Sequence, residues 1–402
     1  MNPKLELLQP YPFEKLNALK AAVTAPTTLS AISLSIGEPK HPAPQFVCNT
    51  LIENINTLAN YPLTKGSDKL RQVITQWLNQ RFSLPQDALD PNRHILPVNG
   101  TREALFAFAQ CIIDPTEQAT VLMPNPFYQI YEGATYLAGA TPVFLNTTKE
   151  NNFIPDFNQV NEETWQRCQL LYLCTPGNPT GAALDHNTLE KLIHLAEKYD
   201  FIIASDECYS EIYPDENNPP KGLLEVSAAM GRLDFKNCVV FHSLSKRSNL
   251  PGLRSGFVAG DAEIMKKFLL YRTYHGCAMP LANQAASEKA WADEEHVIEN
   301  RRLYRQKFDA VIRILRSVTE VSAPDASFYL WLKTPEDDET FAQKLFAQTH
   351  ITILPGSYLS RPVNNINPGK GYVRLALVAQ LDECIEAAQR IKEFIEQNYQ
   401  SN

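Results

Sequence analysis

The chain has 402 residues, of which 44% are hydrophobic and 20% charged, the composition of an ordinary globular protein with room for more than one domain. Its formal net charge is -8 and it contains no run of basic residues, which argues against nucleic acid or an anionic membrane surface as a partner. These values favour a small-molecule partner.

The eight cysteines are scattered singly, with no C-x-x-C pair and no zinc-type spacing to the eight histidines. We therefore expect reduced, mostly buried thiols and no metal site. The N-terminal segment MNPKLELLQPYPFEKL lacks the profile of a signal peptide, and no apolar stretch reaches the roughly 18 residues of a membrane span. Together these features predict a cytoplasmic location.

Short apolar runs alternate with helical patterns along the first three quarters of the chain. A helix is expected over 184–199, where apolar residues recur on one face. This alternation predicts an α/β fold with a mostly parallel central sheet. The runs expected to be buried strands are 120–123, 170–174, 201–204, 239–241 and 256–259.

The last third of the chain has a different organisation. A long helical stretch over 281–317 precedes two strand candidates, FYLWLK and GYVRLALV, and a final amphipathic helix over 381–399. We predict a large domain over 46–289 and a smaller α/β domain built from 1–45 and 290–402.

Four of the apolar runs are followed by polar, turn-like segments: PNPFYQIY, TPGNPTG, SDECYSEI and SLSKR. Ligands of open parallel sheets bind beyond the carboxyl ends of the strands, so we expect these segments to meet in one crevice. A further segment, VNGTREALFAF, places Gly100 and Thr101 before a helix that opens at Arg102. The free N–H groups of such a helix start can bind an anion, although most such caps are purely structural.

Asp206 and Tyr209 lie at the end of the expected strand 201–204. A carboxylate there could be a metal ligand, a base, a helix cap or the counter-ion of a protonated ring nitrogen. A metal is disfavoured because no neighbouring segment offers a second suitable carboxylate or histidine.

Lys246 follows the expected strand 239–241 directly. On its own it could be a solvated surface lysine. Burial would instead lower its pKa and prepare it for Schiff-base chemistry. The neighbouring Ser243, Ser245 and Arg254 suit a phosphate dianion. A lysine beside a phosphate site and facing an aspartate is the arrangement that pyridoxal phosphate requires.

With these motifs in order, the chain resembles the class I/II aminotransferases of the pyridoxal-phosphate aspartate aminotransferase superfamily, fold type I. The resemblance extends from SLSIGEP to GYVRLALV and includes the pattern Ser-x-Ser-Lys-x-x-Asn-x-x-Gly-x-Arg-x-Gly. Ser255 departs from the family, which usually has an aliphatic residue there, and this affects strand packing more than chemistry.

The resemblance implies a catalytic role for three residues. Lys246 would form the covalent internal aldimine with pyridoxal 5'-phosphate and then move the proton between the substrate Cα and the cofactor. Asp206 would keep the pyridine nitrogen protonated. Tyr209 and Asn178 would hydrogen-bond the phenolic oxygen, and Tyr128 would stack on the ring, although Phe127 is a neighbouring candidate.

The resemblance also implies the remaining binding residues. Arg374 and Gly37 would bind the substrate α-carboxylate, together with Asn178. Tyr61 would reach the phosphate from the neighbouring subunit, which implies a homodimer with shared active sites. The phosphate would be held by Ser243, Ser245, Arg254, Gly100, Thr101 and Arg102.

Three other functions fit some of these motifs. Ser243-x-x-Lys246 fits penicillin-binding enzymes, but their Ser-Asp-Asn and Lys-Thr-Gly motifs are absent from the chain. A C–S lyase on the same fold would share Lys246, Asp206 and Arg374, so motifs do not separate it from a transferase. A sensor fused to a DNA-binding module is disfavoured because the chain has no basic helix-turn-helix pattern.

Segments outside the core motifs, such as LLQPYPFEKL and LPGSYLSR, resemble the N-succinyldiaminopimelate aminotransferase branch of bacterial lysine biosynthesis. This implies transfer between glutamate and N-succinyl-2-amino-6-oxopimelate, with Arg102, Lys65 and Arg247 as candidates for the distal carboxylate. Acetylornithine, aspartate, and aromatic amino acids or kynurenine are the alternative amino donors.

Overall fold

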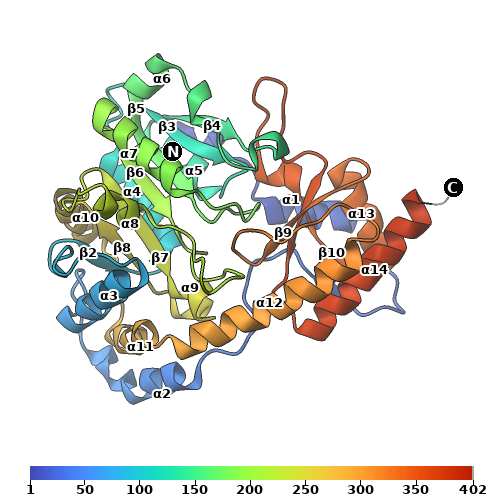
Figure 1. Ribbon diagram of the computed structural model, residues 1–402, viewed down its shortest axis with the longest axis horizontal. Helices are drawn as coiled ribbons and strands as arrows, with labels where there is room; N and C mark the ends of the chain where they lie inside the picture. Colours follow the sequence, from blue (N-terminus) through green and yellow to red (C-terminus); the bar gives the residue numbers. More distant parts are fainter. Residues whose placement is uncertain (401–402) are drawn as a thin grey trace.

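The computed structural model describes residues 1–400 and shows two lobes, each built around its own sheet (Figure 1). The larger sheet has seven strands in the order β2-β8-β7-β6-β5-β3-β4. Strands β3 to β7 run parallel, while β8 is antiparallel to both β7 and β2. The strands are β2 (Ile95–Val98), β3 (Thr120–Asn125), β4 (Thr141–Asn146), β5 (Cys168–Cys174), β6 (Ile202–Asp206), β7 (Cys238–Ser243) and β8 (Gly256–Gly260).

All five strands expected from the sequence are present, and the mostly parallel sheet is confirmed. The two strands that the sequence did not reveal, β2 and β4, lie at the edges of the sheet. Each contains a proline, Pro97 or Pro142. Proline removes a backbone donor and weakens the strand pattern, and it is tolerated at an edge.

The central strands are apolar along their whole length because both faces of the sheet are covered. In β5, Leu171 and Leu173 point into one hydrophobic core, whereas Leu170 and Tyr172 point into the other. This alternation is the two-residue period of a strand. The first core is closed by α3 (Asp68–Arg81), α7 (His186–Tyr199), α8 (Leu223–Ala229) and α11 (Leu281–Ala292), and the second by α4 (Thr101–Ile112), α5 (Ile130–Ala138) and α10 (Ala262–His275).

The second lobe contains the antiparallel sheet β11-β12-β9 and three long helices. The expected helical stretch over 281–317 proves to be α11 followed by α12, a 21-residue helix that runs from one lobe to the other (Figure 1). The elements are β9 (Tyr329–Lys333), β11 (Leu354–Pro355), β12 (Tyr372–Ala376), α12 (Glu295–Leu315), α13 (Asp338–Thr349) and α14 (Leu381–Tyr399).

The N-terminal segment contacts both lobes. Strand β1 (Ile32–Ser33) pairs in parallel with β10 (Ile351–Thr352), and α1 (Pro12–Ala21) contacts α13. The first turn (Pro3–Leu7) instead lies against α5 of the large-sheet lobe. The division into domains at residues 45 and 289 stays a prediction. The remaining elements are α2 (Gln45–Glu53), α6 (Glu162–Arg167), α9 (Leu244–Arg247) and short 3-10 turns at Ile55–Ala59, Lys149–Asn151, Phe157–Gln159, Pro251–Leu253 and Gly356–Leu359.

All eight cysteines are free thiols. Only Cys168, Cys238 and Cys384 are buried, so the expectation of mostly buried thiols was wrong, and the other five are partly exposed. Over residues 1–400, no helix is both long and apolar enough to cross a membrane.

Candidate active site

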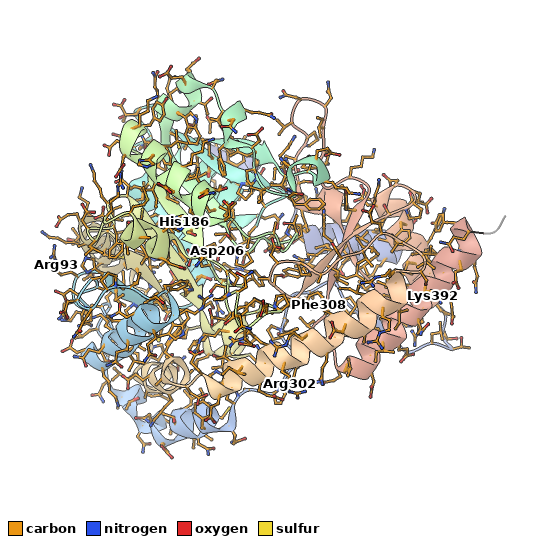
Figure 2. All side chains as sticks on the ribbon, viewed as in Figure 1. Arg93, His186, Asp206, Arg302, Phe308 and Lys392 are labelled. Atoms are coloured by element: carbon orange, nitrogen blue, oxygen red, sulfur yellow. The ribbon has the colours of Figure 1, made fainter. Side chains whose placement is uncertain are left out.

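A cleft of about 450 Å³ opens at the carboxyl ends of the central strands, where the sequence predicted a crevice. Asp206, labelled in Figure 2, marks its position in the large-sheet lobe. The structure brings most of the predicted residues together there, while Gly100 lies just behind the lining and Tyr61 lies outside it. The predicted residues that line the cleft are Gly37, Thr101, Arg102, Tyr128, Asn178, Asp206, Tyr209, Ser243, Ser245, Lys246, Arg254 and Arg374.

Lys246 is placed in the cleft by α9, a single helical turn that follows β7 directly. Ser243 caps this turn, its hydroxyl accepting the N–H of Ser245 at 3.1 Å. The Lys246 ammonium donates to the carbonyl of Gly37. Burial lowers the pKa of Lys246 to about 8, and the positive charges of Arg374 and Arg254 act in the same direction. The amine is therefore deprotonated far more readily than a solvated lysine.

Asp206 ends β6 and is only 4% exposed. Its carboxylate accepts the Tyr131 hydroxyl at 2.6 Å and the backbone N–H of Cys208 at 3.2 Å. Burial raises the pKa of Asp206, while these hydrogen bonds and His242 partly offset that rise. No lysine or arginine within residues 1–400 forms an ion pair with this carboxylate. It is thus a buried acid facing the cleft, with room for a cationic group.

Arg374 on β12 forms the opposite wall and is 4% exposed. Its guanidinium donates to the Asn178 side-chain oxygen at 2.8 Å and to the Ser35 carbonyl at 2.7 Å. It lies 4.3 Å from the ring centre of Tyr329. The Tyr329 hydroxyl is in turn 3.0 Å from that of Tyr209. These contacts hold the guanidinium of Arg374 in one orientation. A planar guanidinium can donate two hydrogen bonds to one carboxylate, so the arrangement suits that group.

Gly37 and Gly100 each leave space that a side chain would fill. A Cβ atom on Gly37 would stand 2.0 Å from the Tyr329 hydroxyl oxygen. A Cβ atom on Gly100 would stand 2.2 Å from a guanidinium nitrogen of Arg254, and Gly100 has a φ of +83°. Glycine is required at both positions because other residues would displace the tyrosine and the arginine.

One part of the cleft lining combines three kinds of group that can donate hydrogen bonds to an anion. Arg254 supplies a guanidinium, Ser243 and Ser245 supply hydroxyls, and α4 opens at Thr101 with its free N–H groups. Such a set can bind a dianion through charge-assisted hydrogen bonds.

The mouth of the cleft is formed by Arg102 and two tyrosines. The guanidinium of Arg102 donates to the Tyr128 hydroxyl at 2.6 Å and to the Tyr11 hydroxyl at 3.4 Å. The side chain of Arg102 is therefore directed at the two tyrosines of the mouth. Its backbone N–H, in contrast, lies in the first turn of α4. Tyr128 lines the cleft, whereas Phe127 is 1% exposed and packs on Phe144 in the core.

Two candidates for a distal substrate contact lie elsewhere in this chain. Arg247 follows Lys246 but points away from the cleft, buried to 1% exposure between Trp77 and Trp291. It points away because consecutive residues of a helical turn face different sides. Lys65 is exposed and outside the cleft. Placing Arg247 in the substrate site was therefore wrong.

Sequence reasoning missed two tyrosines. Tyr131 holds Asp206 and stacks on Tyr172 with ring centres 4.6 Å apart. Tyr329 contacts both Tyr209 and Arg374. Tyr131 is the last residue of the quoted segment PNPFYQIY, and its position three residues after Tyr128 could have indicated that both tyrosines face the same site.

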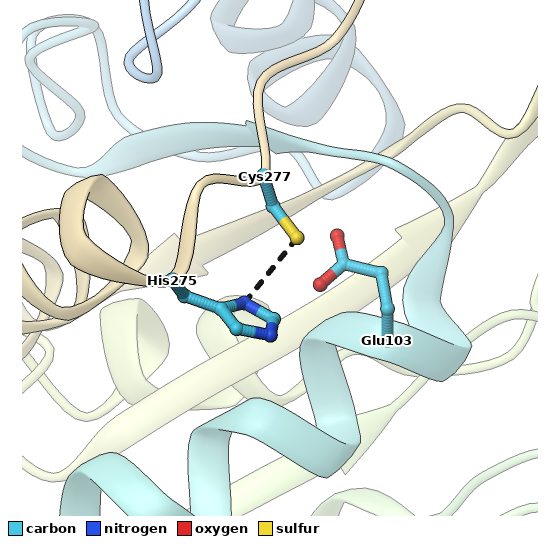
Figure 3. A group of neighbouring side chains, drawn as sticks. All are labelled: Glu103, His275 and Cys277. Atoms are coloured by element: carbon cyan, nitrogen blue, oxygen red, sulfur yellow. Dashed lines mark hydrogen bonds between the residues drawn. The ribbon is translucent and has the colours of Figure 1, made fainter.

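One group of side chains has the donor types and spacing of a metal site. Glu103, His275 and Cys277 offer ligand atoms within 4.8 Å of one another (Figure 3). However, both oxygens of Glu103 already accept from Arg272, at 2.7 and 2.9 Å. Arg272 is completely buried, so Glu103 is its counter-ion, and a divalent cation would compete with that pairing. We assign no metal to this group.

Comparison with known proteins agrees with this geometry. A family model described as "Aminotransferase class I and II" matches residues 30–391. An LL-diaminopimelate aminotransferase of Nitratidesulfovibrio vulgaris is 32% identical in an alignment 396 residues long that covers 96% of this chain and 97% of that protein.

Solved structures that are similar over nearly the whole chain include the following two. An aminotransferase from Neisseria meningitidis is 49% identical, with a TM-score of 0.94 over 98% of this chain and 100% of its own. A Thermus thermophilus protein called "probable N-succinyldiaminopimelate aminotransferase" is 27% identical, with a TM-score of 0.83 over 95% of this chain and 99% of its own.

Proposed function

The chain belongs to the class I and II aminotransferase family, which depends on pyridoxal phosphate, and we propose that it exchanges amino groups between glutamate and N-succinyl-2-amino-6-oxopimelate. The products would be 2-oxoglutarate and N-succinyl-LL-2,6-diaminopimelate, a step of lysine biosynthesis. We propose this particular substrate because of the charged side chains of the cleft that lie beyond the reacting groups.

The residues of the cleft fit the cofactor. The buried Asp206, which has no cationic partner within residues 1–400, suits a protonated pyridine nitrogen. Arg254, Ser243, Ser245 and the start of α4 suit its phosphate. When bound, pyridoxal phosphate supplies an aldehyde that takes the amino group and a ring that accepts the electron pair left at the substrate Cα.

The side chains then have distinct roles in the proposed reaction. Arg374 binds the α-carboxylate and orients the Cα–H bond toward Lys246. Lys246, whose lowered pKa of about 8 leaves about one tenth of the amine neutral at pH 7, takes the Cα proton on its Nζ and later returns it. Tyr209 and Asn178 offer hydrogen-bond donors beside Arg374. Tyr128 lines the cleft and would contact the cofactor ring.

The substrate class follows from the charged side chains of the cleft that have no role in binding the cofactor or the α-carboxylate. Of the charged side chains lining the cleft, only Arg102 and Glu38 are not assigned to the cofactor or the α-carboxylate. Glu38 is paired with Lys40. Arg102 uses its Nε and one Nη for Tyr128 and Tyr11, which leaves guanidinium donors for a ligand. The part of the cleft at Arg102 thus favours an anionic group on the substrate, such as the carboxylate of the succinyl group or the distal carboxylate.

A second candidate substrate is unsuccinylated LL-diaminopimelate, which the relative of 32% identity names. Its distal end carries an ammonium as well as a carboxylate, and the ammonium would need an unpaired acid. Comparing kcat/KM for the two donors, with acetylornithine, aspartate and kynurenine alongside, decides between them. A preference for the free diamine or for an aromatic donor would overturn the succinylated substrate, and release of ammonia or a thiol would indicate a lyase.

We also propose a cytoplasmic homodimer in which Tyr61 completes the partner's site. Tyr61 is fully exposed, and Leu58 and Leu63, which are near it in sequence, are exposed apolar residues as well. A face of this kind is typical of a subunit interface. Mixing inactive Lys246→Ala and Tyr61→Ala chains should restore up to roughly a quarter of the sites, because one site of each hybrid dimer would be intact. No recovery from exchanged subunits would refute the sharing.

A further inference from the structure

The loop that carries Tyr61 is anchored at both of its ends. It follows the 3-10 turn Ile55–Ala59, which packs against α11, and it ends at Ser67, the N-cap of α3. The Ser67 N–H donates to the Gln284 side chain of α11 at 2.7 Å, and its hydroxyl donates to Glu288 at 2.9 Å. The Tyr61 side chain is fully exposed, so its position depends on the backbone of this loop.

Arg71 on α3 fixes the backbone at the end of the loop. Its Nη1 donates to the carbonyl of Lys65 at 3.1 Å and to that of Gly66 at 2.7 Å. The Gly66 N–H closes a turn by donating to the Leu63 carbonyl at 2.9 Å. The guanidinium therefore sets the direction of two successive carbonyls in the turn that follows Tyr61.

The other donors of Arg71 connect the loop to the segment before β2. Its Nε donates to the Pro91 carbonyl at 3.0 Å, and its Nη2 donates to Asn92 at 2.8 Å and to Asp68. All five N–H groups of the guanidinium are thus used, and the residue is only 2% exposed. A side chain with this many partners is held in one orientation, although Arg71 itself does not line the cleft.

The loop also contacts the strand that leads to the cleft of its own chain. A Cβ atom on Gly66 would stand 2.9 Å from Cγ of Pro97 in β2, and α4 opens at Thr101 soon after that strand. An effect of Arg71 on its own site is therefore the competing explanation, which an experiment has to separate from an effect on the partner.

We propose that Arg71 is a positioning residue for the active site of the partner subunit. By fixing the loop, it presents Tyr61 to the phosphate of the cofactor bound in the other chain, and this inference rests on the proposed sharing of Tyr61. Changing Arg71 should weaken cofactor binding about tenfold, because one hydrogen bond to a charged group is lost.

The test uses hybrid dimers of full-length chains in which only one site keeps Lys246. In the first arrangement, Arg71→Lys lies on one chain and Lys246→Ala on the other, so the working site receives Tyr61 from a chain with intact Arg71. In the second, both changes lie on the same chain, and the working site of the unchanged chain receives Tyr61 from an altered loop. Lysine keeps the charge but offers one nitrogen in place of three.

Cofactor affinity is measured by titrating the cofactor-free hybrids with pyridoxal phosphate and following the absorbance change on bonding to Lys246. We expect the first arrangement to bind like a hybrid that carries Lys246→Ala alone, and the second to bind about tenfold more weakly. The reversed order would mean that Arg71 acts on its own site. Equal affinities would mean a general effect or none, and either result overturns the proposal.

Tyr61→Ala in the same two arrangements tests the sharing itself. If Tyr61→Ala shows no difference between them, the shared site and the role of Arg71 are both refuted. If Tyr61→Ala shows the difference and Arg71→Lys and Arg71→Met do not, only the role of Arg71 is refuted. Methionine removes every donor of Arg71, and if neither Arg71 variant forms hybrid dimers, the residue is needed for folding and the proposal fails.

Arg81→Lys is the matched control. Arg81 lies on the same helix, its side chain is 9% exposed, and it donates to the carbonyls of Ser210 and Pro220 in place of those of the loop. In the second arrangement Arg81→Lys should leave the partner's site at full affinity. A weakening equal to that of Arg71→Lys would show that the effect does not pass through the loop.

Discussion

Replacing Arg247 by methionine should destabilise the protein substantially, although the residue touches neither cleft nor substrate. Its guanidinium donates to the carbonyl of Ala290 at 2.7 Å, to that of Asp293 at 3.1 Å, and to Glu294. Ala290 lies in the last turn of α11 and Asp293 follows that helix. Arg247 therefore caps the carboxyl end of α11, where carbonyls lack partners and a positive charge is favoured.

The size of the effect follows from these contacts. Two backbone carbonyls would lose their buried hydrogen-bond donor, and each loss should lower the free energy of unfolding by about 1–3 kcal/mol. Glu294 contributes little, because its side chain is 43% exposed and can return to water. Methionine keeps contact with Trp77 and Trp291 but loses the attraction of their ring faces for the cation. We expect the free energy of unfolding to fall by about 2–5 kcal/mol, which for 402 residues unfolding together corresponds to a Tm lowered by about 2–6 °C.

Thermal unfolding followed by tryptophan fluorescence is a suitable assay, because Trp77 and Trp291 both contact Arg247. Protein and cofactor concentrations must be matched, since both change the apparent Tm. The control is Arg302→Met on α12, whose arginine is 47% exposed and pairs with Glu299, so its effect should stay within about 0.5 kcal/mol. If Arg247→Met and Arg302→Met unfold at the same temperature, Arg247 does not cap α11.

Five further outcomes are expected. Tyr131→Phe removes the 2.6 Å bond that favours the Asp206 carboxylate, so the acidic limb of the kcat profile should move to higher pH, and an unmoved limb would argue against this role. Arg374→Lys replaces the two-pronged donor by a point charge, and kcat/KM should fall about 100-fold; a loss below tenfold would contradict carboxylate binding. In the cofactor-free protein, labelling of Lys246 by an amine reagent should rise with pH around its pKa of about 8, whereas exposed Lys198, whose pKa is raised, should react only at higher pH. Because the unfolded chain holds the Lys246 proton up to a higher pH than the folded chain, this residue should add stability as pH rises above about 8, a trend that Lys246→Met removes. Arg102→Gln should lower kcat/KM about tenfold for the succinylated donor and leave aspartate unaffected, while an equal loss for both would remove Arg102 from the distal site.

Much of the fold could be predicted because the signals are local. The central strands are buried on both faces and therefore appear as unbroken apolar runs, and α7 and α14 show one apolar face. The edge strands β2 and β4 escaped notice because their prolines interrupt the pattern. The break between α11 and α12 was also missed, since it depends on how the two helices dock.

The sequence alone determined the chemistry of the cleft. Lys246, Asp206 and Asn178 follow or end neighbouring parallel strands, and the geometry of such a sheet brings the carboxyl ends of its strands together. Only the tertiary structure decided the direction of each side chain and its distant partners. Arg247 turns toward α11 while Lys246, one residue earlier, faces the cleft, and Tyr131 reaches Asp206 across 75 positions of sequence. Such contacts depend on the packing of separate elements against each other, which no local pattern of residues records.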